Sequence, residues 1–389
     1  MSELNCTFNE KTNTYNLLYK SLKKQFDVNY VVNCPDFFDY KPVCVYDGFI
    51  FAILFNAMEC GETLNTDLPI TANCIRNANY LIEAWNNMLP NKYKKIQIHA
   101  TNVILNRLKV PTNKAISAFS GGVDSCFTLI RHKEKDWTSF HYDLNAVLTI
   151  HGFDIPPDRD DEYNQLIERI SPIPKQYDCH HLQVKTDLRH KSKQDWEMSH
   201  LAQISSCIHL FSEHYDYGLI ASSVSYKDPF SIWGSTTGTD FLLSGSNLEL
   251  INDGAGYTRT EKIARISSNH LVTERLKVCW EKAYKNNCGE CEKCYRTRLG
   301  LMTVGVYNPA CFDTPISLKK IKKIKLKNAS GILGFKGILF YAKKHNVQGA
   351  WLAEMRKAII RGKLFFIPIE KLNKLRKRLK QYLKDHSKN

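Results

Sequence analysis

Two short stretches of the chain contain residues whose types and spacing could do chemistry. The first is Ser-Gly-Gly-Val-Asp-Ser at residues 120–125, which follows an apolar strand candidate and opens an apolar helix candidate. Gly121 and Gly122 allow the backbone to approach a ligand closely and to adopt positive φ. Successive backbone N–H groups in such a turn, together with the positive end of the following helix, are typical of an anion-binding site.

The polar side chains of this loop add to its phosphate-binding character. Ser120 and Ser125 can donate hydrogen bonds to phosphate oxygens, whereas Asp124 does not favour a bare phosphate and implies a magnesium ion or ordered water. The loop matches neither G-x-x-x-x-G-K-[ST] nor G-x-G-x-x-G, so the usual phosphate loop and a nicotinamide cofactor are unsupported. The alternative is a glycine turn that only joins a strand to a helix. The agreement of the motif with its flanking elements favours the binding interpretation.

The second stretch is a cluster of cysteines with the spacing C-x8-C-x2-C-x2-C. Its members are Cys279, Cys288, Cys291 and Cys294. Four thiolates at this spacing fit a tetrahedral zinc site, and Gly289 eases the turn between them. An iron–sulfur cluster and a redox or persulfide C-x-x-C are the alternatives. We expect zinc, with the cysteines in a structural role.

The elements that must position these residues alternate between strand and helix. The strand candidates are residues 115–120, 144–153, 180–186 and 217–223, and the helix candidates are 161–170 and 198–215. This alternation predicts the α/β class, with a doubly wound parallel sheet covered by helices on both faces. Ligands bind such sheets at the carboxyl ends of the strands, which is where residues 120–125 are expected.

The loop resembles the S-G-G-x-D-S pyrophosphate loop of the PP-loop (N-type) ATP pyrophosphatases, whose sheet is of the HUP-like kind. Every fixed position of that pattern is met, and the residues expected to bind ATP are Ser120, Gly121, Gly122, Val123, Asp124 and Ser125. The resemblance implies that the loop grips the β- and γ-phosphates while a substrate oxygen attacks the α-phosphate and pyrophosphate leaves. It makes Asp124 and Ser125 the catalytic residues, with Asp124 organising Mg²⁺.

Loop and cysteines together resemble the 7-cyano-7-deazaguanine synthases, the PP-loop enzymes of the queuosine precursor pathway, across residues 113–305. That family ends in C-x8-C-G-x-C-x-x-C, and its T-K-x-E helix start is matched by Thr258, Arg259 and Glu261, with Arg in place of Lys. The resemblance implies that a carboxylate is activated as an acyl adenylate and that ammonia or another amine displaces AMP. A second ATP then dehydrates the amide to a nitrile in that family.

Four further residues are expected to line the adenylate or substrate pocket. They are His151, Ser222, Asp240 and Arg259. The family's segment after the fourth strand is replaced here by VSYKDPFSIWGSTTGTDF, within which Asp240 stands in for the family's acid, and Thr297 stands where the family usually has Arg. We therefore expect a 7-deazaguanine-type carboxylate or a related carboxylate or carbonyl as the substrate.

Composition and charge bound the remaining possibilities. The chain has 389 residues and 13 cysteines, with no export signal at its start, which favours a reducing compartment and hence the cytoplasm. No apolar run approaches the roughly 20 residues that span a bilayer. Residues 318–389 carry 21 Lys and Arg against 3 Asp and Glu, so they hold +18 while the rest of the chain holds −3. This tail could contact an anionic partner, either nucleic acid or an acidic protein.

Three domains and three functions are therefore predicted. Residues 1–112 form an N-terminal α+β accessory domain, 113–311 form the PP-loop domain with the zinc module at 279–294, and 312–389 form a basic helical extension. The first function is ATP-dependent adenylation for C–N bond formation. The second is a PP-loop enzyme that thiolates tRNA, which needs a reactive cysteine among the last three of the cluster. The third is an ATP-binding subunit of a modification or defence system that has lost turnover.

Overall fold

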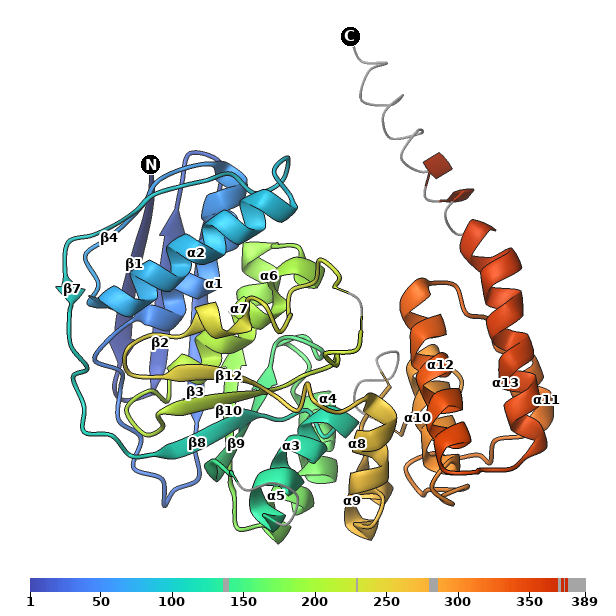
Figure 1. Cartoon of the computed structure of the whole chain (residues 1–389). Helices are drawn as coiled ribbons and strands as arrows, with labels where there is room; N and C mark the ends of the chain where they lie inside the picture. The colour runs from blue at the N-terminus through green and yellow to red at the C-terminus, as the bar shows by residue number, and fades with distance from the viewer. Residues whose placement is uncertain (136–139, 229, 280–285, 370–371, 374, 377–389) are drawn as a thin grey trace. The chain divides into compact units, whose positions relative to one another are not determined.

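The computed structural model describes the chain except for residues 136–139, 229, 280–285, 370–371, 374 and 377–389 (Figure 1). The chain divides into two compact units, of which the first begins at Met1 and the second begins at Thr258. The division between the two units falls at Tyr257–Thr258. Among the described residues, no helix combines the length and apolar character that a bilayer crossing requires.

The first unit is built on a ten-stranded sheet in the order β12-β11-β8-β9-β10-β3-β2-β1-β4-β6. Its strands are β1 (Ser2–Asn9), β2 (Thr14–Lys20), β3 (Gln25–Asn33), β4 (Leu64–Thr66), β6 (Ile98–Ala100), β8 (Lys114–Ala118), β9 (Asp143–His151), β10 (His180–Thr186), β11 (Tyr217–Ala221) and β12 (Glu249–Asp253). The pairs from β12 to β10 are parallel, as are β1–β4 and β4–β6, whereas β10–β3, β3–β2 and β2–β1 are antiparallel. A separate pair joins β5 (Ile70–Thr71) to β7 (Val103–Ile104). The predicted α/β class with a largely parallel sheet is confirmed.

Helices cover both faces of this sheet (Figure 1). One face carries α1 (Asp47–Cys60), α2 (Ala72–Met88), α6 (Leu188–Ser192) and α7 (Trp196–His209), and the other carries α3 (Val123–Glu134), α4 (Asp160–Ile170) and α5 (Pro172–Gln176). Thirteen of the fourteen residues of α1 are buried, which is why apolar residues lie on all sides of this helix. A short 3₁₀ turn, η1 (Asp240–Leu243), precedes β12.

The chain order of the parallel strands places the loop at residues 120–125. Strand β8 is the first of the five along the chain, and it lies between β9, the second, and β11, the fourth. The connection from β8 runs to β9, whereas the connection from its other neighbour β11 runs to β12 on the opposite side. The carboxyl ends of β8 and β11 therefore flank a topological switch point, where α/β sheets bind ligands. The loop directly follows the carboxyl end of β8 and opens α3.

The N-terminal residues extend the same sheet. Strand β3 pairs antiparallel with β10, with Val32 opposite Val184, and the Asp187 carboxylate accepts a hydrogen bond of 2.9 Å from the Asn29 N–H. One core contains side chains from Leu4 to Leu250. Residues 1–112, which were expected to form an accessory domain, therefore belong to the same compact unit as the parallel strands.

The second unit is helical and has its own core. Its helices are α8 (Arg259–Ile266), α9 (His270–Arg275), α10 (Glu292–Met302), α11 (Leu318–Lys322), α12 (Ala329–Lys344) and α13 (Ala350–Arg361), and a π-helical turn at Gly362–Phe366 continues α13. Leu299 and Met302 of α10 share this core with Phe335, Trp351 and Met355. The basic extension thus packs on the helix that follows the cysteine cluster. The last part of the basic extension, residues 377–389, lies outside the described residues.

Candidate functional site

The loop at residues 120–125 is shaped by one glycine and by the start of α3. Gly121 has φ +69°, a left-handed conformation that costs other residues about 1–2 kcal/mol. Helix α3 begins at Val123 with Gly122 as its N-cap, and this glycine has no side chain that could cap the helix. The positive end of the α3 dipole therefore lies at the loop, where it favours an anion.

Hydrogen bonds between Ser120 and Ser125 connect the first and last residues of the loop. The Ser120 N–H donates to Ser125 Oγ at 3.4 Å, and the two hydroxyl oxygens are also 3.4 Å apart. Ser125 in turn donates to the Gly122 carbonyl at 3.2 Å. Ser125 is buried whereas Ser120 is exposed, and Asp124 lies in the first turn of α3. The structure brings together the six residues of the predicted ATP loop, as their adjacency in sequence requires.

A partly buried chain of hydroxyls and a histidine supports the loop from the neighbouring strands. Thr149 of β9 donates at 2.8 Å to the carbonyl of Phe119, the residue just before the loop. His181 of β10 bridges Thr149 Oγ1 at 2.8 Å and Ser171 Oγ at 3.0 Å. Burial lowers the pKa of His181 to about 4, so the ring is neutral at pH 7. Sequence analysis did not assign these supporting residues.

An ion cluster fixes α3 to the end of β12. The buried Asp253 carboxylate accepts hydrogen bonds from Thr128 at 2.7 Å and Arg131 at 2.7 Å, and His132 Nε2 lies 3.2 Å away. Burial acts to raise the pKa of Asp253, but His132, Arg131 and Thr128 together hold it below its ordinary value. This carboxylate holds the helix that follows the loop. In the sequence, this role of Asp253 is indicated only by its position at the end of an apolar strand.

The four cysteines of the second unit converge as predicted. Their sulfur atoms all lie within 4.8 Å of one another, with Cys279 Sγ 4.0 Å from Cys291 Sγ and Cys288 Sγ 3.8 Å from Cys294 Sγ. Four sulfurs at about 2.3 Å from a tetrahedral zinc ion are about 3.8 Å apart, so the donor set has the right size. This four-cysteine group could therefore hold a metal ion.

Backbone N–H groups and an asparagine shape the cysteine cluster. Cys288 Sγ accepts from the Cys291 N–H at 3.2 Å, and Cys291 Sγ caps α10 by accepting from the Cys294 N–H at 3.4 Å. A hydrogen bond from the Cys294 thiol outweighs burial and lowers the pKa of the Cys291 thiol to about 5. The buried Asn287 side chain accepts from the Cys279 N–H at 3.0 Å and donates to the Cys311 carbonyl at 2.9 Å. Asn287 therefore links the backbone at Cys279 to the segment that contains Cys288, Cys291 and Cys294.

The four residues expected in the pocket each have a structural partner or a separate location. His151 stacks on Tyr163 with centroids 4.2 Å apart and lies 2.8 Å from the Pro156 carbonyl, and burial lowers its pKa. Ser222 donates to the Val224 carbonyl at 2.7 Å. Asp240 opens η1, and Arg259 opens α8 in the second unit. Their place in an adenylate pocket stays a prediction.

Asp240 is buried at the start of η1. Its carboxylate accepts hydrogen bonds from Ser235 at 2.8 Å, from the Thr236 N–H at 2.7 Å and from Asn252 at 2.6 Å. Burial raises its pKa to about 6 although these hydrogen bonds oppose the shift. Asp240 therefore holds the segment after β11 against β12, and it is the carboxyl of the expected pocket whose charge changes near neutral pH.

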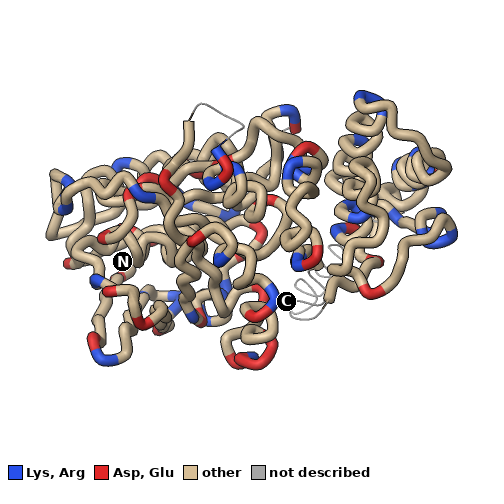
Figure 2. The backbone as a smooth tube through the Cα atoms, turned by 90° about the horizontal axis from the view of Figure 1, so that it is seen from below, with Lys and Arg blue, Asp and Glu red and all other residues tan. Residues whose placement is uncertain are grey.

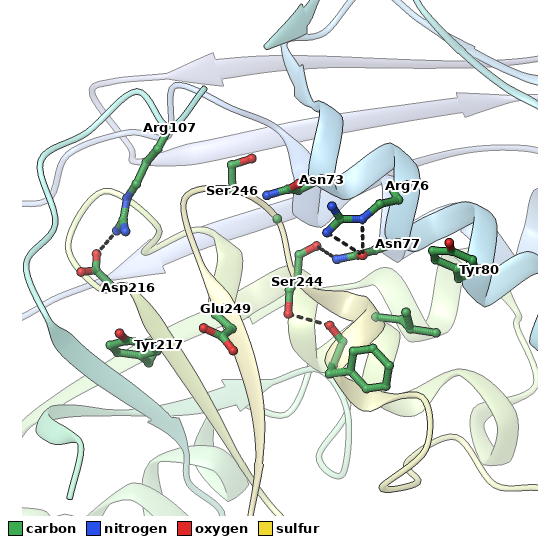
Figure 3. Close-up of a pocket in the computed structure, with 13 residues that line it drawn as sticks. Asn73, Arg76, Asn77, Tyr80, Arg107, Asp216, Tyr217, Ser244, Ser246 and Glu249 are labelled. Atoms are coloured by element: carbon green, nitrogen blue, oxygen red, sulfur yellow. Dashed lines mark hydrogen bonds and ion pairs between the residues drawn. The ribbon is translucent and has the colours of Figure 1, made fainter. Parts of the chain in front are cut away.

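A cavity of about 500 Å³ lies at the other end of the sheet (Figure 3). Tyr217 and Glu249, which begin β11 and β12, line it together with the first turns of α2. Several of its polar groups bind one another: Asn77 donates to the Ser244 carbonyl at 2.9 Å, and Arg107 pairs with Asp216. Sequence analysis did not predict this cavity. Its place at the amino ends of the strands separates it from the loop at residues 120–125.

Comparisons of the chain with protein-family models, with curated proteins and with solved structures found no match.

Proposed function

We propose that this chain is an ATP-dependent enzyme of the PP-loop pyrophosphatase type, related to the 7-cyano-7-deazaguanine synthases. The observation that carries the proposal is the position of Ser-Gly-Gly-Val-Asp-Ser. The motif follows the first strand of the parallel sheet, at its switch point, and opens α3, whose N-cap is Gly122. Sequence and position thus favour the same ligand, a polyphosphate.

The proposed reaction adenylates a carboxylate. A substrate carboxylate oxygen attacks the α-phosphorus of ATP, the bond to the β-phosphate oxygen breaks, and pyrophosphate leaves with its electron pair. Ammonia or another amine then attacks the acyl carbon and AMP departs. The loop N–H groups, Ser120 and Ser125 would hold the leaving pyrophosphate, and Asp124 would position the Mg²⁺ that accompanies it.

The cysteine cluster is proposed to hold zinc in a structural role. The second candidate, thiolation of tRNA, requires one of Cys288, Cys291 or Cys294 to act on a substrate. The convergence of all four sulfurs within 4.8 Å favours shared metal ligation over a free reactive thiol.

Product analysis tests the proposal. Purified chain is incubated with ATP, Mg²⁺, ammonia and 7-carboxy-7-deazaguanine, and AMP, pyrophosphate and the mass of the purine are followed. We expect AMP and an amide or nitrile product, reduced at least about a hundredfold by Asp124→Ala. Asp158→Ala, which changes an exposed aspartate, is the matched control.

The other outcomes separate the alternatives. AMP without a changed purine would keep the adenylating enzyme and redirect the search to other carboxylates or carbonyls. ATP binding that never yields AMP with any acceptor would support the non-catalytic subunit. Absence of ATP binding by the folded protein would overturn the proposal.

A further inference from the structure

The C-terminal helices combine an extreme charge with exposed aliphatic side chains. Residues 317–369 contain 13 Lys and Arg and one acid, Glu354. Figure 2 shows the positions of Lys and Arg in blue along the described chain. Glu354 is nearly buried and pairs with Lys357 at 2.9 Å. Lys320 pairs with Glu290 of the same unit at 2.9 Å. Little of this charge is therefore neutralised by the described acids, and an anionic surface is the partner that it fits.

Exposed aliphatic residues form a regular series that starts in the last turn of α13. We call this series the apolar stripe, and its members are Ile360, Leu364, Ile369, Leu372 and Leu375. Each of the five side chains is more than half exposed to solvent. Large aliphatic residues gathered at this density are uncommon on a surface that contacts only water.

A π-helical turn keeps the apolar stripe on one side. Successive members are separated by four, five, three and three residues, and the five-residue step spans the turn at Gly362–Phe366. There the Ile367 N–H donates to the Gly362 carbonyl, five residues back. Pro368, which follows, lacks an N–H and favours such an irregularity. A π-helical turn contains about one residue more than an α-helical turn. Two residues that are five apart across this turn, Leu364 and Ile369, therefore lie on the same face of the helix.

Lysines from another helix lie beside the start of the apolar stripe. Arg361 donates to the Lys322 carbonyl at 2.6 Å, and the Lys325 ammonium is 6.0 Å from the centre of the Phe366 ring. These contacts bring α11 and the segment after it to the end of α13. We call the exposed lysines of this region the basic collar, and they are Lys319, Lys322, Lys323, Lys325 and Lys363.

We propose that the apolar stripe and the basic collar bind the surface of an anionic lipid bilayer. The aliphatic side chains would enter the boundary between headgroups and acyl chains, and the lysines would contact anionic headgroups. This binding is peripheral, and it is independent of the reaction proposed for the loop at residues 120–125.

Three other occupants fit these observations less well. A second copy would bring like charge against the basic collar. Nucleic acid would satisfy the lysines, but it offers stacking surfaces for aromatic residues and no site for five aliphatic side chains. A groove on an acidic protein would accept the apolar stripe, yet the basic collar extends to α11, outside the helix that such a groove would enclose. A bilayer is wide enough to contact both.

Vesicle binding of the full chain tests this proposal. Sedimentation is measured with vesicles of phosphatidylcholine alone and of phosphatidylcholine mixed with phosphatidylglycerol. We expect partition onto the mixed vesicles only. High salt should weaken it strongly, because the Debye length falls from about 10 Å at 0.1 M to about 3 Å at 1 M.

Variants of the apolar stripe and of the basic collar, each with a matched control, test whether these side chains bind the vesicles. Leu364→Ser with Leu372→Ser should weaken partition at least about tenfold, whereas Leu22→Ser with Phe37→Ser, at exposed sites of the first unit, should leave it unchanged. Lys322→Glu, Lys325→Glu and Lys363→Glu together should weaken it on the order of a hundredfold. Lys11→Glu, Lys20→Glu and Lys175→Glu make the same charge change at exposed positions of the first unit and are expected to have a much smaller effect. Circular dichroism checks that each variant is folded.

Two results would overturn the proposal. One is the absence of partition onto the anionic vesicles by the folded protein. The other is binding of an RNA or DNA duplex that the collar variants abolish and the Leu364→Ser, Leu372→Ser variant does not change, with equal vesicle binding by both stripe and control variants. That pattern would assign the surface to nucleic acid.

Discussion

At the scale of single residues, Gly121 has the most restrictive conformation in the candidate phosphate loop. Its φ of +69° predicts that Gly121→Ala costs about 1–2 kcal/mol in the loop conformation and weakens ATP binding by about 5- to 30-fold. Gly256→Ala is the matched control, since a Cβ there meets nothing within 4 Å. Calorimetric titration with ATP and thermal unfolding measure both quantities. Equal ATP affinity in the two variants would show that the loop does not need this backbone conformation.

His181 gives the loop a pH dependence of stability. Its pKa of about 4 in the folded protein is below the value of about 6.5 for a free histidine, so the unfolded chain binds more protons between these values. The free energy of unfolding should therefore be fully retained above pH of about 6.5 and fall as the pH is lowered toward 4, by at most about 3 kcal/mol from this group.

Urea unfolding at several pH values measures this effect. His181→Asn should reduce the slope of stability against pH across that window, because it removes the group that takes up the proton. His345→Asn, at an exposed histidine of the second unit, should leave the slope unchanged. A slope identical in all three proteins would contradict the assignment to His181.

At the scale of elements, the cysteine cluster connects two chain segments to the start of α10. We expect one zinc ion per chain, and Cys291→Ser should remove it, although a serine at this position can still cap α10. Metal content by mass spectrometry should fall to near zero and the Tm should drop by several degrees. Cys311→Ser changes a buried cysteine outside the group and should keep the metal. A Cys291→Ser protein that retains a full equivalent of zinc would disprove the assignment.

Elements that are continuous in the sequence could be predicted, whereas pairings between distant segments could not. Strands β8 to β11 are short apolar runs bounded by polar residues, and the loop and the last three cysteines are contiguous motifs, so local patterns were sufficient. Asn287, Thr149 and Asp253 carry no such pattern, because their roles depend on partners brought close by folding. Helix α1 likewise shows little helical periodicity, since it is buried on all sides.

At the scale of the whole molecule, the pairing of β3 with β10 joins the first strands to the parallel strands in one sheet. Tyr30 is fully buried and its hydroxyl lies 3.2 Å from Ser206 Oγ of α7, and Asn56 of α1 donates to the Ser192 carbonyl at 2.9 Å. Composition alone could suggest separate domains, because residues 1–112 mix strand and helix signals without a motif. Only the long-range pairing shows that the first unit has a continuous core.

This continuity predicts how fragments behave. A fragment of residues 1–257 should be soluble and unfold in one cooperative transition, because it contains the complete core of the first unit. A fragment of residues 113–311 should aggregate, since it leaves the β10 edge unpaired and removes α1 from the apolar side of α7. Expression of both fragments, followed by size-exclusion chromatography and urea unfolding, measures this difference. A soluble 113–311 fragment with a cooperative transition would instead establish that the parallel strands fold without the N-terminal region, and that residues 1–112 are an accessory domain after all.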